Sequence, residues 1–314
     1  MRVLRILAGY ILLVLLGGGL LAPWLYWSGQ WAAHELPGFE RLAAASFSKY
    51  VSRAAEFLAL FGLVWLLPAV GLGSWRSWWR GGARQSLRRA LDGALLGWFS
   101  LAIVAGLALG FGARRWDISL SAGEVMRASL GAALAAVVVA LMEEIVFRGG
   151  LFGAMKREWP LGWAILGSSA VYALVHFLET PEWKAPVGPW SGLGALPHMM
   201  AGFGNLTKLI PGFLNLTLAG ALLALAFARF GTLYFSIGLH AGWIFWLKWY
   251  GIVTDQAAGK NDWLWGTRKL VDGWVVFPIL AILTAFFWFR RRTTDALDDA
   301  KQPTDRSGGF EKLA

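Results

Sequence analysis

Long apolar stretches, separated by short polar and basic segments, dominate the sequence. About eight of them approach the roughly 20 residues that cross a bilayer as a helix. They lie at residues 3–27, 55–73, 91–113, 130–155, 161–178, 213–230, 232–250 and 271–289. We therefore predict an all-α, polytopic membrane protein with about eight transmembrane helices.

The composition supports a membrane setting. Hydrophobic residues make up 57% of the 314 residues, with 20 Trp and 20 Phe, which is more than a soluble domain of this size can bury. The absence of Cys excludes disulfides, thiolate catalysis and zinc held by Cys. The formal charge of +10 comes from residues that flank the apolar stretches rather than from one basic stripe. We therefore expect a lipid bilayer, and no nucleic acid, as the partner of these residues.

The basic residues also indicate an orientation, because cytoplasmic loops are enriched in Lys and Arg. An N-terminus inside the cell places on the cytoplasmic side Arg76, Arg80, Arg84, Arg88, Arg89, Lys156, Arg157, Arg290, Arg291 and Arg292. We predict a multi-pass protein of a bacterial inner or cell membrane with both termini in the cytoplasm. Residues 74–90 interleave Trp with Arg and predict an interfacial helix, and the Pro- and Gly-rich residues 179–211 predict an external loop or a re-entrant segment.

Two adjacent carboxylates, Glu143 and Glu144, interrupt the apolar stretch at 130–155. Because a charge in hydrocarbon is unfavourable by about 3 kcal/mol even on lenient scales, it normally faces protein or a water cavity and marks a functional site. Helical spacing puts Arg148 on the face of Glu144, where the two can pair, and turns Glu143 away from both. Glu143 is therefore the candidate general base. If the helix ended near Arg148 instead, both carboxylates would lie at the headgroup interface.

Two other apolar stretches each contribute a histidine. His176 shares a helical face with Ser169 and Tyr172, and His240 has Ser236 one turn before it. Taken singly, each His is expected to pack or to form a hydrogen bond between helices. Together with Glu143 they form a set that can exchange protons near neutral pH, which suits the activation of water.

The order of these motifs resembles a known family. Glu143-Glu144-x-x-x-Arg148, then Tyr172-x-x-x-His176, then residues 237–243 around His240 are similar to the CPBP family, the CAAX protease and bacteriocin-processing family of intramembrane glutamic endopeptidases. The similarity covers about residues 120–250. It implies a catalytic core in the second half of the membrane domain. We therefore divide the chain into three parts. Residues 1–118 hold the first helices and the basic interfacial segment, residues 119–292 hold the protease core and the last helix, and residues 293–314 form a polar cytoplasmic tail.

The resemblance also implies roles. Glu143 and His176 would activate the water that attacks the scissile carbonyl, His240 would stabilise the oxyanion, and Glu144 with Arg148 would support them. Tyr172 stands where the family usually has Phe.

One departure concerns the oxyanion. The family's Asn four residues after the third-motif His is Ile244 here, which cannot donate a hydrogen bond. Loss of one oxyanion donor raises a barrier by about 2.7 to 4 kcal/mol unless another replaces it. Asn205, Asn215, Trp243 or a backbone N–H would then have to substitute, or the protein would be slow or inactive.

The predicted function is hydrolysis of a membrane-associated protein or peptide by glutamate- and histidine-activated water, with no cofactor or metal. Three alternatives stay open. One Glu with two His could hold zinc for the same hydrolysis. The buried ionisable groups could instead serve a proton-coupled transporter, although no internal repeat supports one. A catalytically silent membrane scaffold or immunity protein would tolerate Ile244.

Overall fold

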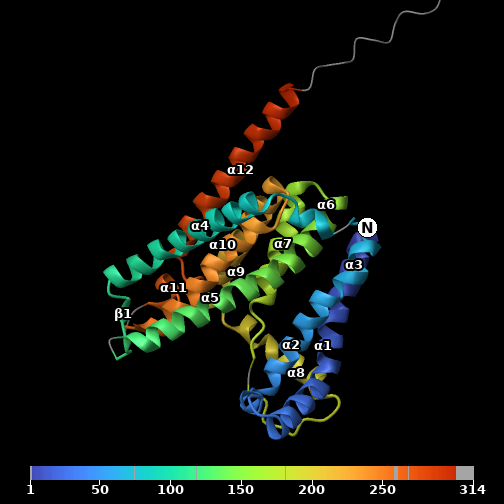
Figure 1. The fold of residues 1–314 in the computed structure, drawn as a ribbon, viewed down its shortest axis with the longest axis vertical. Helices are drawn as coiled ribbons and strands as arrows, with labels where there is room; N and C mark the ends of the chain where they lie inside the picture. The colour runs from blue at the N-terminus through green and yellow to red at the C-terminus, as the bar shows by residue number, and fades with distance from the viewer. Residues whose placement is uncertain are drawn as a thin grey trace, which may run out of the picture.

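The computed structural model describes residues 2–73, 75–117, 119–180, 182–257, 261–267 and 269–301, and these residues are helical almost throughout (Figure 1). Two three-residue strands, β1 (Arg114–Trp116) and β2 (Thr254–Gln256), pair antiparallel beyond the ends of two helices. The predicted all-α class is confirmed.

The described helices follow one another along the chain as α1 (Arg2–Glu35), α2 (Phe47–Phe61), α3 (Leu63–Ala69), α4 (Ala83–Gly110), α5 (Ala122–Glu144), α6 (Gly153–Glu158), α7 (Leu161–Val175), α8 (Ser191–Met199), α9 (Leu206–Phe230), α10 (Tyr234–Val253), α11 (Asp262–Trp265) and α12 (Val276–Lys301). Short 3-10 turns are η1 (Glu40–Leu42), η2 (Trp75–Trp79) and η4 (Met200–Gly204), and η3 (Ile145–Phe152) is a π-helix.

Fewer helices than predicted are long and apolar enough to cross a membrane. Among the described residues there are four, Arg2–Glu35, Ala83–Gly110, Ala122–Glu158 and Leu206–Phe230, or five if α2 and α3, bent by 41°, form one span. The predicted count of about eight is therefore not confirmed. At 1.5 Å per residue, the 15 residues of α7 reach roughly 22 Å, short of the about 30 Å of a hydrocarbon core.

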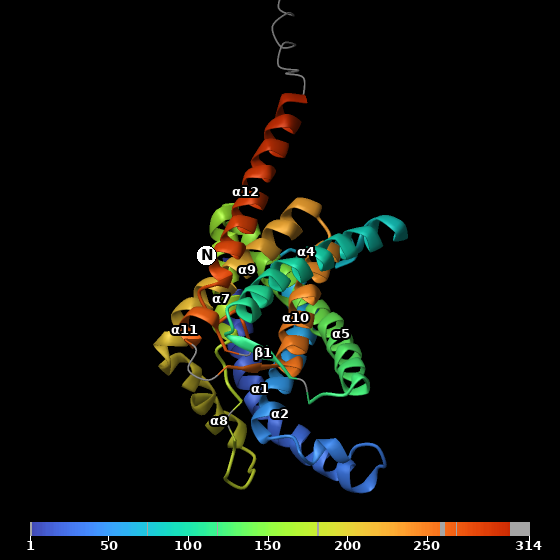
Figure 2. The ribbon, with the colours of Figure 1, turned by 90° about the vertical axis from the view of Figure 1, so that its left-hand side faces the viewer.

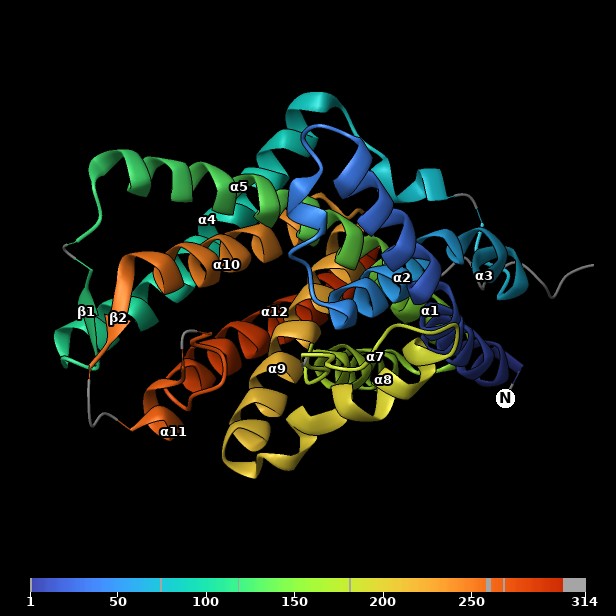
Figure 3. The ribbon, with the colours of Figure 1, turned by 90° about the horizontal axis from the view of Figure 1, so that it is seen from below.

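The N-terminal helices form a group of their own beside the rest. Figure 3 shows α1 and α2 close to α8, at the opposite end from β1 and β2. Ala22, Phe47 and Ala54 pack with Ala195 and Met199 in one buried cluster. The segment 179–211, predicted as a loop or a re-entrant segment, thus contains a helix, α8, that packs on α1.

Two predicted segments differ in the structure. The single interfacial helix expected at 74–90 is divided, because Gly81 adopts a φ of 126° between η2 and the start of α4. The predicted tail at 293–314 begins inside α12, which runs to Lys301; residues 302–314 lie outside the described residues.

The packing of α4 on α10 depends on small residues, and Figures 1 and 2 both show the two helices beside each other. A Cβ at Gly93 or Gly97 would collide with the backbone of α10, and one at Gly238 or Gly242 would collide with the backbone of α4. Small residues four apart allow membrane helices to approach this closely. His240 lies between the two glycines of α10, so this contact fixes its backbone.

Helix α5 begins at a capping box, in which the Ser121 side chain accepts from the Glu124 backbone N–H and the Glu124 carboxylate accepts from the Ser121 backbone N–H. Farther along, Ala136 and Ala140 of α5 pack against Ile244 of α10. Helix α5 continues through η3 into α6, so the helix does not end near Arg148, as the headgroup-interface alternative required.

Candidate active site

The carboxylate pair lies where the α-helix widens. Glu144 is the last residue of α5, and the π-helix η3 follows at once. Such wide turns are rare and often occur at functional sites. A Cβ at Gly149 would collide with the ring of Trp78, and one at Gly150 with Leu63, so the two glycines let these side chains cover η3. The sequence pattern of the apolar stretch did not indicate a π-helix.

Glu144 is fully buried and holds two partners. Its Oε1 atom lies 3.1 Å from the Arg148 guanidinium and 3.0 Å from Nδ1 of His240. Arg148, which is 2% exposed, also donates to the carbonyl oxygen of Gly220 on α9 at 3.4 Å and lies over the ring of Tyr172, 4.5 Å from its centre. The predicted pair therefore forms, and it connects η3 with α7, α9 and α10.

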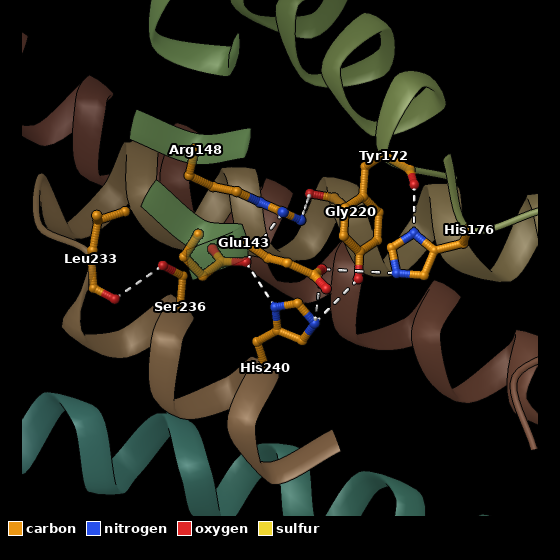
Figure 4. Close-up of polar contacts among 9 residues, drawn as sticks. Glu143, Arg148, Tyr172, His176, Gly220, Leu233, Ser236 and His240 are labelled. Carbon is orange, nitrogen blue, oxygen red and sulfur yellow. Dashed lines mark hydrogen bonds and ion pairs between the residues drawn. The ribbon is translucent and has the colours of Figure 1, made fainter. Parts of the chain in front are cut away.

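Glu143 faces away from that pair and toward both histidines (Figure 4). Its Oε2 atom is 3.8 Å from Nε2 of His176 and 3.7 Å from Nε2 of His240. This oxygen is buried and has no hydrogen-bond partner among the described residues, although the side chain is 27% exposed. His176 lies directly after the last residue of α7, rather than within a continuing span as predicted.

The hydrogen bonds at Nδ1 define how each imidazole faces Glu143. Nδ1 of His176 is 2.7 Å from the backbone carbonyl of Tyr172, an atom that can only accept, so Nδ1 carries a proton. Nδ1 of His240 donates to the Glu144 carboxylate in the same way. In its neutral form each ring therefore directs an unprotonated Nε2 at the Glu143 carboxylate, and three acceptors converge.

These groups line a cavity of about 320 Å³. Glu143, Tyr172, His176 and His240 line it together with apolar residues that include Leu101, Val139, Trp243, Ile244, Leu247 and Leu280. The cavity is also lined by exposed or partly exposed polar residues of the segments after α7 and before α12, namely Glu179, Asn205, Lys208, Lys269 and Asp272. The polar residues indicate a mouth on that side of the molecule.

The proposed substitutes for the missing Asn differ in their availability. Asn215 is buried and its Nδ2 donates to the carbonyl oxygens of Val271 and Gly273 at 2.8 and 2.7 Å. Trp243 donates its Nε1 proton to Ser100 at 2.9 Å. Asn205 lies at the mouth, where its side-chain oxygen accepts from Lys208 at the start of α9.

Ser236, one turn before His240, is occupied elsewhere, because its hydroxyl donates to the Leu233 carbonyl at 3.1 Å. Among the described residues, no group of three or more His, Cys, Asp and Glu side chains has the arrangement of a metal site.

The six residues singled out in the sequence thus meet in one place, on α5, η3, α7, the turn after α7, and α10, and all but Glu144 are labelled in Figure 4. Residues 126–246 match the family model for the type II CAAX prenyl endopeptidase Rce1-like family. This match spans all six residues and confirms the resemblance to the CAAX protease family. No curated protein and no solved structure matches the chain.

Proposed function

We propose that this protein, whose residues 126–246 match the Rce1-like family of CAAX endopeptidases, is an intramembrane endopeptidase that cleaves a membrane-associated protein or peptide with water activated by Glu143 and His176. The observation that carries the proposal is the convergence of the Glu143 carboxylate and two unprotonated Nε2 atoms in the lining of a largely apolar cavity. Three acceptors in one place favour a molecule that brings protons, and water can donate to two of them.

In the proposed reaction, a water donates one hydrogen to the Glu143 carboxylate and the other to Nε2 of His176. Glu143 takes the proton as the water oxygen attacks the scissile carbonyl carbon, which becomes a tetrahedral oxyanion. The C–N bond then breaks, and the proton held by Glu143 passes to the leaving nitrogen. Glu144 and Arg148 act by position, because they hold His240 with its Nδ1 proton turned away from the reacting atoms.

The substrate class follows from the cavity and from the family description. The cavity wall is mostly apolar, which favours a lipid-modified or membrane-embedded chain near the scissile bond. The matched family is described as a prenyl endopeptidase, so a peptide with a prenylated Cys three residues before its C-terminus is the first substrate to test.

The test compares the wild type with Glu143→Gln in detergent micelles, using quenched fluorescent peptides with and without an S-farnesyl group. The amide keeps the shape of the side chain but cannot take a proton from water, so cleavage should fall by at least about 10²-fold while the melting temperature stays nearly unchanged. Glu56→Gln is the matched control, because Glu56 is an exposed carboxylate on α2 that pairs with Arg53.

Near wild-type turnover of Glu143→Gln would refute the mechanism. Each assay is repeated with a chelator, and loss of wild-type activity that is restored by added zinc would favour the zinc-dependent alternative. Equal cleavage of the farnesylated and unmodified peptides would leave the hydrolysis intact and remove the prenyl preference.

A further inference from the structure

We propose that the Tyr172 hydroxyl is the hydrogen-bond donor to the oxyanion, a role that the side chain at position 244 cannot fill. The inference rests on the proposed function, since it assigns a group to the reaction at that same site. It concerns a single proton, the one on the phenolic oxygen, and no bond to that oxygen is made or broken.

The ring of Tyr172 is held so that its hydroxyl has a defined direction. The Arg148 guanidinium lies over the ring at 4.5 Å, the Phe147 ring meets it edge-on at 5.1 Å, and the His176 ring lies 4.4 Å away. The side chain is buried in the protein and lines the cavity. Figure 4 shows its hydroxyl pointing toward Glu143 and the two imidazoles.

The Tyr172 hydroxyl differs from the neighbouring polar groups in having a proton that it can donate. The Tyr172 oxygen lies 3.3 Å from Nε2 of His240. Because Nδ1 of His240 donates to Glu144, Nε2 of the neutral ring has no proton and the Tyr172 O–H must be the donor in this contact. A neutral His240 therefore cannot give a hydrogen bond to an oxyanion through Nε2. Of Glu143, Tyr172, His176 and His240 in the cavity lining, Tyr172 is therefore the residue whose side-chain proton can turn to an oxyanion, because the Nδ1 protons of the two histidines are held by the Tyr172 carbonyl and the Glu144 carboxylate.

The other side chains considered for this role are apolar, have their donors occupied or, in the case of Asn205, lie exposed among the polar residues at the mouth of the cavity. Ile244 lines the cavity without a polar atom. The donors of Asn215 and Trp243 are bound to backbone carbonyls and to Ser100. Rotation about the bond between the ring and the oxygen is enough to turn the Tyr172 proton from Nε2 of His240 to an oxyanion that forms beside Glu143. A donor placed in this way favours the charged intermediate over the neutral substrate, which is the requirement for acceleration.

The experiment measures kcat and KM for the peptide that the wild type cleaves fastest, in Tyr172→Phe, Ile244→Asn and the double variant. Tyr172→Phe keeps the ring and its contacts and removes the proton, so we expect kcat to fall about 10²-fold with little change in KM. Ile244→Asn places a new donor on the cavity wall one turn after His240. The kcat of the double variant should therefore be at least about tenfold higher than that of Tyr172→Phe. A purely structural role of Tyr172 would give no such rescue.

Tyr234→Phe is the matched control. It removes a hydroxyl that donates to a backbone carbonyl, that of Trp79, at 3.2 Å, on the same helix as His240 but outside the cavity lining. Its kcat should equal that of the wild type. If Tyr172→Phe is poorly folded, 3-fluorotyrosine at position 172 replaces it, because this residue keeps the hydroxyl but ionises at a lower pH. The alkaline limb of kcat should then move to lower pH.

The outcomes separate the two proposals. If Glu143→Gln cleaves as the wild type does, the proposed function fails and this inference fails with it. If Glu143→Gln is inactive but Tyr172→Phe keeps wild-type kcat, or if the fluorinated protein has an unchanged pH profile, the oxyanion role of Tyr172 is overturned and the proposed function stands. A fall in kcat with rescue by Ile244→Asn supports the inference.

Discussion

Removal of Glu144 is the perturbation for which the structure gives the clearest magnitude. Its carboxylate is fully buried and contacts the Arg148 guanidinium at 3.1 Å and Nδ1 of His240 at 3.0 Å. Arg148 is 2% exposed in the wild type. In Glu144→Ala the same guanidinium is therefore buried without its counter-charge. Breaking a buried pair by removing one partner destabilises a protein by about 3 to 5 kcal/mol. The Nδ1 proton of His240 also loses its acceptor, which adds about 1 to 3 kcal/mol.

The double variant Glu144→Ala with Arg148→Ala should be less damaged than the sum of the two single variants, because it strands neither charge. We expect an interaction free energy of about 1 to 3 kcal/mol, the upper part of the range for residues in direct contact. Recovery will be incomplete. The double variant still lacks the acceptor for His240 and the cation over the ring of Tyr172.

Unfolding by SDS in mixed micelles measures these free energies, with the fluorescence of the 20 Trp as the signal. The control cycle uses Arg53 and Glu56 on α2, whose side chains are 71% and 46% exposed and three residues apart. Their interaction should be no more than about 1 kcal/mol. Equal and additive losses in both cycles would refute the reasoning, since the buried pair would then behave as a surface pair does.

Two further predictions test the packing and the orientation. Gly238→Leu should destabilise the protein and abolish cleavage, because the new side chain collides with the α4 backbone at Ala90. The control is Gly106→Leu, at a position on α4 where an added Cβ meets nothing, and it should change neither the melting temperature nor the turnover. The chain has no Cys, so Lys208→Cys and Arg84→Cys can be labelled singly; a maleimide that does not cross membranes should label position 208 and not position 84 in intact cells, and the reverse pattern would contradict the orientation predicted from the basic residues.

The meeting of the candidate site residues could be predicted from the sequence for a physical reason. Ionisable side chains in a membrane segment must find partners, and few are available. The choice of partners is therefore narrow: Glu143 and Glu144 lie in one apolar stretch, and His176 and His240 lie in two others. The i to i+4 spacing to Arg148 was enough to distinguish the paired carboxylate from the unpaired one.

The features that the sequence did not reveal arise from contacts between distant segments. Trp78 and Leu63 lie against Gly149 and Gly150 of the π-helix after Glu144, and neither side chain is near in sequence. The predicted number of about eight spans was not confirmed, because an apolar stretch shows composition but not where its helix ends. The stretch at 161–178 is an example, since its helix ends at Val175 and leaves His176 on the following turn.

Contacts between distant segments also explain why an apolar residue, Ile244, follows His240 by one turn in a site where an oxyanion is proposed to form. Ile244 lines the cavity and also packs against Ala136 and Ala140, so it attaches α10 to α5. A polar side chain there would have to find a partner among small apolar groups of α5, and a buried amide without one costs about 1 to 3 kcal/mol. Helix α7 has no such constraint at Tyr172, where Arg148 and the two imidazoles already form a polar environment. A hydrogen-bond donor on α7 therefore lets α10 keep its apolar contact with α5.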